Sequence, residues 1–265
     1  MKILQWKKSF LQITDIYGLQ DKSSEIPKSD IIIHSQLPKQ ILENKRFTLH
    51  KRFKTLQIDI KQSEKNLYSN LNRNTRYNIK RAKREQLKFE ISTQPTEEEI
   101  DDFSVLYNRF AKKKGIAPCN INKLRALRKK NLLMISYVKD QNNQILCSHV
   151  SSTNDDRAYL IYSCSIRLFV DPSQKNKIGR ANKYLHWMEM LYFKQSGCSI
   201  YDFSGLSLEV DNVELQKIDQ FKRRFGGTEV MEYKCYEAKS LLGKMVLYYL
   251  YLKWRSRFEF IKVMF

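Results

Sequence analysis

Hydrophobic and polar positions alternate in short runs along the second half of the chain. Residues 132–139, 145–153 and 158–166 are rich in apolar and β-branched side chains, and polar turns separate them. Runs of this length between turn residues are typical of strands. The pattern therefore predicts an antiparallel meander of three strands.

A helical rhythm follows the meander. Apolar side chains recur at helical spacing from about residue 179 to 195, where Gly197 ends the pattern, and again at 212–225. Strands are predicted at 199–203 and 228–238. The resulting order, β-β-β-α-β-α-β, indicates an α/β (α+β) fold in which helices pack on a mixed sheet.

The first half of the chain is predicted to begin with short strands, which include residues 31–33 and 55–60. Ser63 can cap a helix that continues to about Lys88. A second helix is predicted to start near Thr96, because the glutamates that follow it suit the positive end of a helix.

Lys222 interrupts the apolar face of the helix predicted at 212–225. Four apolar residues fall within one arc of about 120° on a helical projection, and Lys222 lies inside that arc: Leu215, Ile218, Phe221 and Phe225. A lysine in this position either extends its ammonium to solvent or meets an anion, because an unpaired buried charge is unfavourable. Lys222 is therefore a candidate functional residue, with an extended surface lysine as the alternative.

The tail, residues 241–265, combines an apolar, tyrosine-rich run at 245–252 with basic and aromatic residues after it. The run is shorter than the roughly 20 apolar residues that cross a bilayer. Its composition is typical of a helix in a membrane interface, where aromatic rings lie at headgroup level and cations meet anionic lipid. A helix packed on the domain is the alternative.

The charge of the chain narrows the choice of partners. The 265 residues carry a formal net charge of +20, while 42% of them are hydrophobic and can form a core. Such an excess indicates phosphates, RNA or an anionic membrane surface, with solubility alone as the alternative. The five cysteines lack the spacing of a zinc site or a redox pair. This pattern and the absence of a signal-peptide pattern predict a cytoplasmic protein with reduced thiols.

Three segments carry polar residues that such a fold could use. They are residues 72–82 (NRNTRYNIKRA), 178–187 (IGRANKYLHW) and 201–205 (YDFSG), the last followed by 221–227 (FKRRFGG). In this order, the segments and the predicted elements resemble the GNAT-like acyltransferases. Within that group they resemble the Fem-type aminoacyl (peptidoglycan bridge) transferases and the GNAT-like proteins of polysaccharide clusters.

The resemblance implies a tandem arrangement, with an abbreviated N-terminal GNAT-like unit at 1–130, a complete unit at 131–240 and a basic amphipathic tail at 241–265. It also implies an acyltransferase that moves an acyl or aminoacyl group to an amine of a cell-envelope saccharide or peptidoglycan precursor. The donor would be acyl-CoA or an aminoacyl-tRNA, without a metal. The acceptor would be nucleotide- or lipid-linked, and the protein would work at the inner face of the cytoplasmic membrane.

Acyl transfer to an amine requires that the amine lose a proton, that the carbonyl lie close to it and that the oxyanion be stabilised. Asp202, at the end of a predicted strand, is a candidate for positioning or deprotonating the ammonium, and a loop-capping aspartate is the alternative. The resemblance implies that Lys222 serves the donor or the transition state. Asp202 and Lys222 are therefore the predicted catalytic residues.

The donor is expected where the helix after the meander begins, because helix N-termini favour anions and GNAT proteins bind a donor pyrophosphate there. Lys177, Gly179, Arg180 and Ala181 occupy that point. The glycine-rich loop of the family is reduced to Gly179, which weakens the CoA interpretation. The surrounding cations are compatible with the 3′ end of a tRNA.

Arg73, Arg76 and Lys80 are candidates for acceptor phosphates, because arginine suits bidentate phosphate contacts. His149 and His186 are interpreted as core residues, and no metal cluster is visible in the sequence. A non-catalytic RNA- or membrane-binding protein on a degenerate GNAT scaffold is the alternative function.

Overall fold

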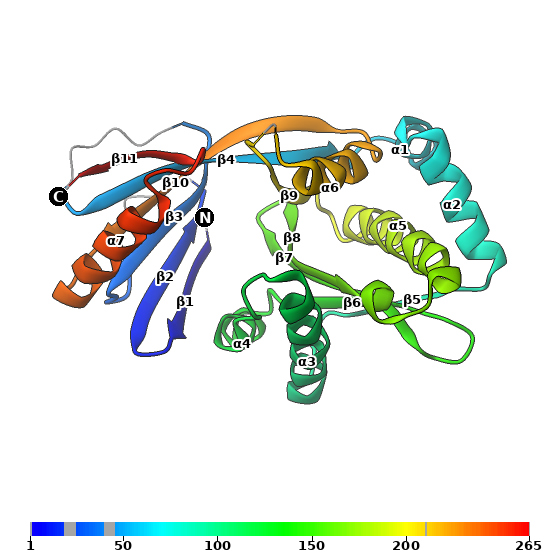
Figure 1. The fold of residues 1–265 in the computed structure, drawn as a ribbon, viewed down its shortest axis with the longest axis horizontal. Helices are drawn as coiled ribbons and strands as arrows, with labels where there is room; N and C mark the ends of the chain where they lie inside the picture. Colours follow the sequence, from blue (N-terminus) through cyan, green and yellow to red (C-terminus); the bar gives the residue numbers. More distant parts are fainter. Residues whose placement is uncertain (1, 19–24, 40–45, 210, 265) are drawn as a thin grey trace. The chain divides into compact units, whose positions relative to one another are not determined.

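The chain forms two compact units (Figure 1). The computed structural model describes residues 2–18, 25–39, 46–209 and 211–264. The first unit is drawn from residues 1–56, 204–220 and 228–265, and the second from residues 57–203 and 221–227.

The second unit is built on a mixed sheet in the strand order β9-β8-β7-β6-β5. These strands are β5 (Lys88–Ser92), β6 (Met134–Lys139), β7 (Ile145–Asn154), β8 (Arg157–Ser165) and β9 (Ile200–Leu206). Neighbours from β5 to β8 pair antiparallel, and β8 pairs parallel with β9. The predicted meander is confirmed as β6, β7 and β8.

Helices flank this sheet. They are α1 (Glu64–Asn70), α2 (Arg73–Arg84), α3 (Glu97–Lys114), α4 (Ile121–Lys129), the short η1 (Ile166–Phe169) and α5 (Pro172–Gln195). The predicted cap is confirmed, because the hydroxyl of Ser63 accepts a hydrogen bond from the N–H of Asn66. The helix predicted to start near Thr96 is also confirmed, and Thr96 forms a capping box with Glu99 there. The single helix predicted up to Lys88 is two helices, since the side chain of Asn72 caps a new start.

The predicted start of α5 was wrong. The helix begins at Pro172, about two turns before residue 179. Proline is favoured in the first helical turn because its φ angle is already helical and its missing N–H is not needed there. The turns between are polar and partly exposed, so they carry no apolar rhythm that the sequence could reveal.

The first unit contains β1 (Lys2–Lys8), β2 (Leu11–Tyr17), β3 (Ile31–Leu37), β4 (Thr48–Asp59), β10 (Thr228–Ala238), α7 (Leu241–Trp254) and β11 (Phe260–Met264). The strand order is β1-β2-β3-β10-β4, and β11 also pairs with β4. The strand β11 was not predicted, because the tail was interpreted as one helical segment. The helix α6 (Val213–Arg223) contributes residues to both units.

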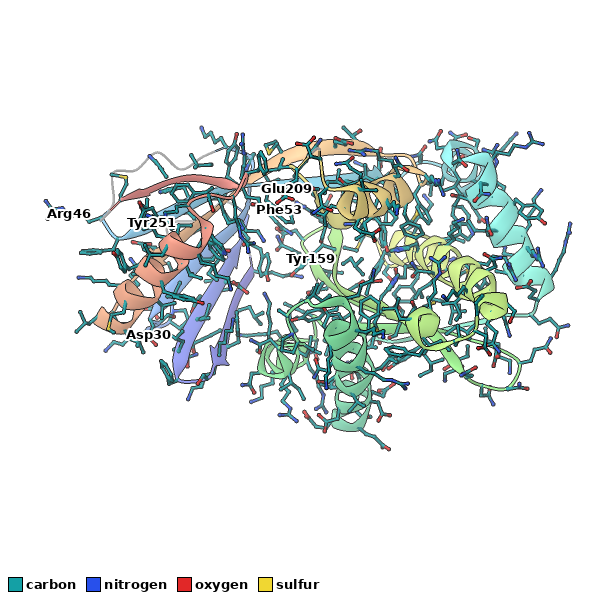
Figure 2. All side chains as sticks on the ribbon, in the orientation of Figure 1. Asp30, Arg46, Phe53, Tyr159, Glu209 and Tyr251 are labelled. Carbon is teal, nitrogen blue, oxygen red and sulfur yellow. The ribbon has the colours of Figure 1, made fainter. Side chains whose placement is uncertain are left out.

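The helix α7 packs on its own unit through one face. Leu247 is fully buried there with Leu49 and Ala238, and Tyr251, labelled in Figure 2, lies against the same cluster. At the start of the helix, Asp30 accepts a hydrogen bond from the hydroxyl of Ser240. The packed helix that the sequence left as an alternative is therefore present.

The order β-β-β-α-β-α-β predicted for residues 132–238 is confirmed as β6-β7-β8-α5-β9-α6-β10. The five cysteines are free. Within the described residues, no helix has the length and apolar character needed to cross a bilayer. The tandem division at residues 130 and 240 stays a prediction, because the two compact units are defined by packing rather than by repetition of a fold.

Candidate functional site

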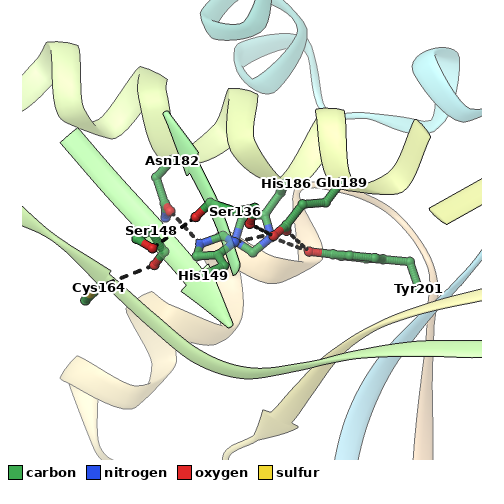
Figure 3. A network of polar contacts seen from close by, with 8 residues as sticks. All are labelled: Ser136, Ser148, His149, Cys164, Asn182, His186, Glu189 and Tyr201. Atoms are coloured by element: carbon green, nitrogen blue, oxygen red, sulfur yellow. Dashed lines mark hydrogen bonds and ion pairs between the residues drawn. The ribbon is translucent and has the colours of Figure 1, made fainter. Parts of the chain in front are cut away.

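A network of buried polar side chains lies between α5 and the sheet of the second unit (Figure 3). The helix provides Asn182, His186 and Glu189, whose spacing places them on one helical face. The strand β7 provides His149, and β9 provides Tyr201. The side chains of His149 and Glu189 are 0% exposed, so this network is part of the core.

Glu189 is the centre of the network. Its Oε2 accepts a hydrogen bond from the Tyr201 hydroxyl at 2.6 Å and lies 3.0 Å from Nδ1 of His149. Its Oε1 accepts a hydrogen bond from the hydroxyl of Ser136 on β6. The other ring nitrogen of His149, Nε2, lies 3.0 Å from Oδ1 of Asn182. A carboxylate that accepts several hydrogen bonds can be buried without an unpaired charge.

The protonation of His186 follows from its partners. Its Nδ1 lies 2.8 Å from the hydroxyl of Tyr201, which gives its own proton to Glu189. Nδ1 of His186 must therefore carry the proton, which leaves the lone pair on Nε2. Burial above all, and then the charges of His149 and Lys222, lower the pKa of His186 well below its usual range, so the ring is neutral.

Aromatic rings surround His186. The ring centroids of Phe203 and Phe225 lie 4.5 Å and 5.3 Å from that of the histidine, and Phe221 lies at 5.6 Å. Burial, followed by the charge of Glu189, also raises the pKa of Tyr201 well above its usual range. The Tyr201 phenol and the His186 imidazole are therefore both neutral polar groups in a dry environment.

Lys222 lies at the last turn of α6, half-buried and close enough to His186 for its charge to act on the ring. The predicted apolar arc around it is only partly correct. Phe225 is buried, but Ile218 is 48% exposed and Asp219 is buried in its place. The carboxylate of Asp219 accepts a hydrogen bond from the N–H of Ser207 at 3.0 Å, and this bond permits its burial.

Asp202 is 1% exposed and forms an ion pair with Arg157. The guanidinium Nε of Arg157 lies 2.9 Å from Oδ2 of Asp202. Successive side chains of a strand point to opposite faces, so Asp202 projects away from the face of β9 that carries Tyr201 and Phe203. A carboxylate that a guanidinium holds in place is suited to positioning a further cation.

The residues predicted to bind the donor lie inside α5. Lys177 donates a hydrogen bond to Asp140 at 3.0 Å, and Arg180 forms a bidentate pair with Glu85 at 2.7 and 3.0 Å. Ala181 is fully buried. Because the helix starts at Pro172, the N–H groups of residues 177–181 lie beyond its first turn, where N–H groups bond within the helix. The expectation that these residues present free N–H groups was wrong.

The residues predicted to bind the acceptor lie on α2 and differ in their surroundings. Arg73 and Lys80 are exposed. Arg76 instead donates hydrogen bonds to the carbonyl oxygens of Ser69 and Leu71, at 2.7 and 2.6 Å. Arg76 therefore stabilises the junction of α1 and α2, and Arg73 and Lys80 are the two whose charges face solvent.

One group in the described residues has the composition of a metal site. His149, His186 and Glu189 each offer a ligand atom, and these atoms lie within 4.8 Å of one another. His149 and Glu189 contact Asn182, Tyr201 and each other without an ion, whereas the described contacts give Nε2 of His186 no polar partner. The arrangement fits a hydrogen-bonded core network. Sequence reasoning missed it, although the polar residues at 182, 186 and 189 interrupt the apolar face of α5 as Lys222 does on α6.

Comparisons with known proteins place the fold. No protein-family model and no curated protein matches the sequence. Among solved structures, FemX has a TM-score of 0.59 and 12% identity over 94% of this chain and 85% of FemX. L-PGS from Bacillus licheniformis has a TM-score of 0.54 and 12% identity, over 93% of this chain and 84% of that protein.

A third similar structure is the C-terminal domain (DUF2156) of a protein described as a lysylphosphatidylglycerol synthetase, from Agrobacterium fabrum. It has a TM-score of 0.55 and 9% identity over 94% of this chain and 84% of that domain. At these identities the likeness concerns the fold. The chain has the GNAT-like acyltransferase fold that its residues predict.

Proposed function

We propose that this protein is an acyltransferase that moves an acyl or aminoacyl group to an amine of a cell-envelope saccharide or peptidoglycan precursor. The observation that carries the proposal is the position of Lys222. The residue is half-buried and its charge acts on the neutral ring of His186, which belongs to a buried hydrogen-bonded network. The likeness in fold to FemX supports the same class of reaction.

The chemistry assigned to Lys222 is electrostatic. The amine nitrogen of the acceptor attacks the donor carbonyl carbon, and the carbonyl oxygen gains negative charge. A fixed ammonium stabilises that oxyanion more strongly in a dry site than in water. The intermediate then collapses, and the bond to the thiol of CoA or to the ribose hydroxyl of a tRNA breaks.

Asp202 is proposed to position the acceptor ammonium. Its carboxylate already pairs with the guanidinium of Arg157, and a carboxylate attracts an ammonium ion. The amine must lose a proton before it attacks, and Asp202 is the proposed first acceptor of that proton. Because Asp202 points to the face of β9 opposite Tyr201 and Phe203, it would take the proton before the amine reaches the donor carbonyl beside Lys222. Arg73 and Lys80 are proposed to contact phosphates of the acceptor, with Arg76 supporting them from the helix junction.

The donor is proposed to be acyl-CoA or an aminoacyl-tRNA. Lys177 and Arg180 already pair with Asp140 and Glu85, so a donor phosphate would have to displace a carboxylate at each. The donor site at 177 and 179–181 is therefore supported by charge alone.

We also propose that the protein works in the cytoplasm, at the membrane surface. The outward face of α7 exposes Leu241, Met245, Tyr248, Tyr249 and Leu252. Lys253, Arg255 and Arg257 follow and are exposed. Apolar and aromatic side chains next to cations match an anionic bilayer, where rings enter the headgroup layer and cations meet lipid phosphates.

A transfer assay with purified protein tests the catalytic assignment. Lys222→Ala is expected to lower the transfer rate by about 10²-fold or more, because removing one group that stabilises an oxyanion has an effect of this size. Asp202→Asn is expected to lower the rate as well. The matched control is Lys217→Ala on the same helix, because this lysine is exposed and pairs only with Glu214 among the described contacts.

Near-normal rates in Lys222→Ala and Asp202→Asn, with unchanged thermal unfolding, would disprove the site. Steeply salt-dependent tRNA binding without transfer from either donor would instead favour the non-catalytic RNA-binding function.

A further inference from the structure

Lys183 and Arg224 contact the start of α2, and Arg167 lies near Lys183. Lys183 of α5 donates a hydrogen bond from Nζ to Oδ1 of Asn74, at 2.8 Å. Arg224, just after α6, accepts a hydrogen bond at its carbonyl oxygen from the N–H of Asn72, at 2.8 Å. Arg167 of η1 lies near enough for its charge to act on Lys183. These residues all belong to the same compact unit.

Lys183 differs from two other cations of its helix. Lys177 and Arg180, about two turns and one turn earlier, each pair with a carboxylate. Within the described part of the chain, the hydrogen-bond partner of Lys183 is instead a neutral amide, and its charged neighbours Arg167 and Arg224 are also positive. The cluster therefore contains three cations without an anion.

The pKa of Lys183 agrees with this position among other cations. Burial above all, and then the charges of Arg224 and Arg167, lower the pKa of Lys183 to about 8. A lysine in this state is still mostly charged at neutral pH, but at a free-energy cost. An anion that entered the cluster would remove that cost, because it would pair with the ammonium and both guanidinium groups at once.

We propose that Lys183, Arg224 and Arg167 bind a phosphate or diphosphate group of the acceptor. A phosphate offers several charged oxygens, so it can accept from the ammonium and from two planar guanidinium groups together. Arg73, in the same turn of α2 as Asn74, belongs to the residues proposed to bind the acceptor. The assignment to the acceptor rests on the proposed function, whereas anion binding by the cluster does not.

Isothermal titration calorimetry with inorganic pyrophosphate, at fixed ionic strength, tests the site in the full chain. Lys183→Met keeps the buried stem and removes the charge, and it is expected to weaken pyrophosphate binding at least ten-fold, as is Arg224→Gln. Lys83→Gln is the matched control, because it removes an equal charge from the exposed last turn of α2 and is expected to change binding less than two-fold. Equal weakening in all three variants, or no binding to the wild type, would overturn the site.

Steady-state kinetics distinguish the source of the phosphate. If the group belongs to the acceptor, Lys183→Met raises the KM for the acceptor and leaves the KM for the donor unchanged. A rise in the KM for acyl-CoA or for aminoacyl-tRNA would overturn the assignment to the acceptor. Should the wild type transfer no acyl group, the proposed function fails, while the calorimetry still decides whether the anion site exists.

Discussion

At the scale of single residues, the second unit tolerates the buried carboxylates of Asp140, Glu189 and Asp202 because each accepts hydrogen bonds, whereas the buried hydroxyls of Thr75, Ser151 and Ser152 form none among the described residues. Glu189 accepts hydrogen bonds from Tyr201 and Ser136, and its Oε2 also lies 3.0 Å from Nδ1 of His149. A network of this kind is stable only when it is complete, because removing one acceptor leaves several buried donors without a partner.

Glu189→Gln is expected to lower the free energy of unfolding by about 2–4 kcal/mol, because the amide replaces one acceptor oxygen with a donor that faces other donors. Urea unfolding monitored by circular dichroism measures the change. Glu98→Gln on the exposed side of α3 is the control and should change stability by less than about 0.5 kcal/mol. A comparably small change in Glu189→Gln would show that the network does not contribute as described.

Two buried histidines make stability depend on pH. Burial and then the charge of Lys262 lower the pKa of His50 to about 4, and burial lowers the pKa of His186 well below its usual range. The unfolded chain takes up these protons near pH 6.5, so it binds more protons than the folded chain below that pH. The stability is complete above about pH 6.5 and is lost as the pH falls toward 4, by about 1.4 kcal/mol per pH unit for each histidine.

Urea unfolding at pH 7 and pH 5 tests this dependence. His50→Gln removes one of the two histidines, so the loss between these values should shrink by about 2 kcal/mol relative to the wild type. Identical losses in both proteins would mean that His50 takes up its proton as readily in the folded chain as in the unfolded one.

At the scale of elements, helices and strands were predictable wherever a buried face repeats regularly. Leu56 and Ile58 alternate with polar residues and are buried in β4, within the strand predicted at 55–60. By contrast, α4 lies in a basic stretch and buries only Leu124 and Leu127, too few to set a rhythm. The start of α5 was hidden for the same reason, since its first turns bury little.

The same reasoning explains how much of the site was predictable. Lys222 is recognisable because it breaks an apolar face, and the structure places it beside the polar network. Contacts between distant segments, such as His149 with Glu189 or Lys183 with Asn74, depend on which strands and helices become neighbours. The periodicity within one segment does not predict which elements become neighbours.

A substitution at Gly179 can distinguish a structural role of this position in α5 from a role in donor binding. It lies in the interior of the helix, and a Cβ added there would meet no heavy atom within 4 Å. Gly179→Ala is therefore expected to raise the free energy of unfolding by about 0.5–1 kcal/mol, since alanine has the higher helix propensity. Thermal unfolding measures the gain, and a loss of stability would contradict the open surroundings. An accompanying rise in the KM for the donor would support donor binding at this turn.

The outward face of α7 can be tested without removing the tail. Truncation at residue 241 would expose the core around Leu247, so its effect could not be separated from unfolding. The double variant Tyr249→Ser with Leu252→Ser changes two exposed side chains and is expected to weaken binding to anionic phosphatidylglycerol vesicles at least five-fold. Val105→Ser, at an equally exposed position on α3, is the control for sedimentation with vesicles. Unchanged vesicle binding in the double variant would disprove the membrane contact.

At the scale of the whole molecule, the net charge of +20 is neutralised by nearby acids in some regions more than in others. Arg125 and Arg128 of α4 pair with Glu97 on α3, so acids partly neutralise the positive charge of α4. The cluster of Lys183, Arg224 and Arg167 has no such acids among the described contacts. Anions should therefore concentrate at particular places, and the total charge alone would not indicate which.

The pairing of β3 with β10 also has a consequence for folding during translation. His34 lies opposite Cys235, so this part of the sheet joins residues separated by about 200 positions. During translation, residues 57–203 can collapse on their own sheet while β3 still waits for its partner strand. Long-range strand pairing is slow and leaves apolar edges uncovered until it is complete. The order of synthesis therefore leaves the β10 edge of β3 uncovered longest, since β2 already pairs with β1 and β3.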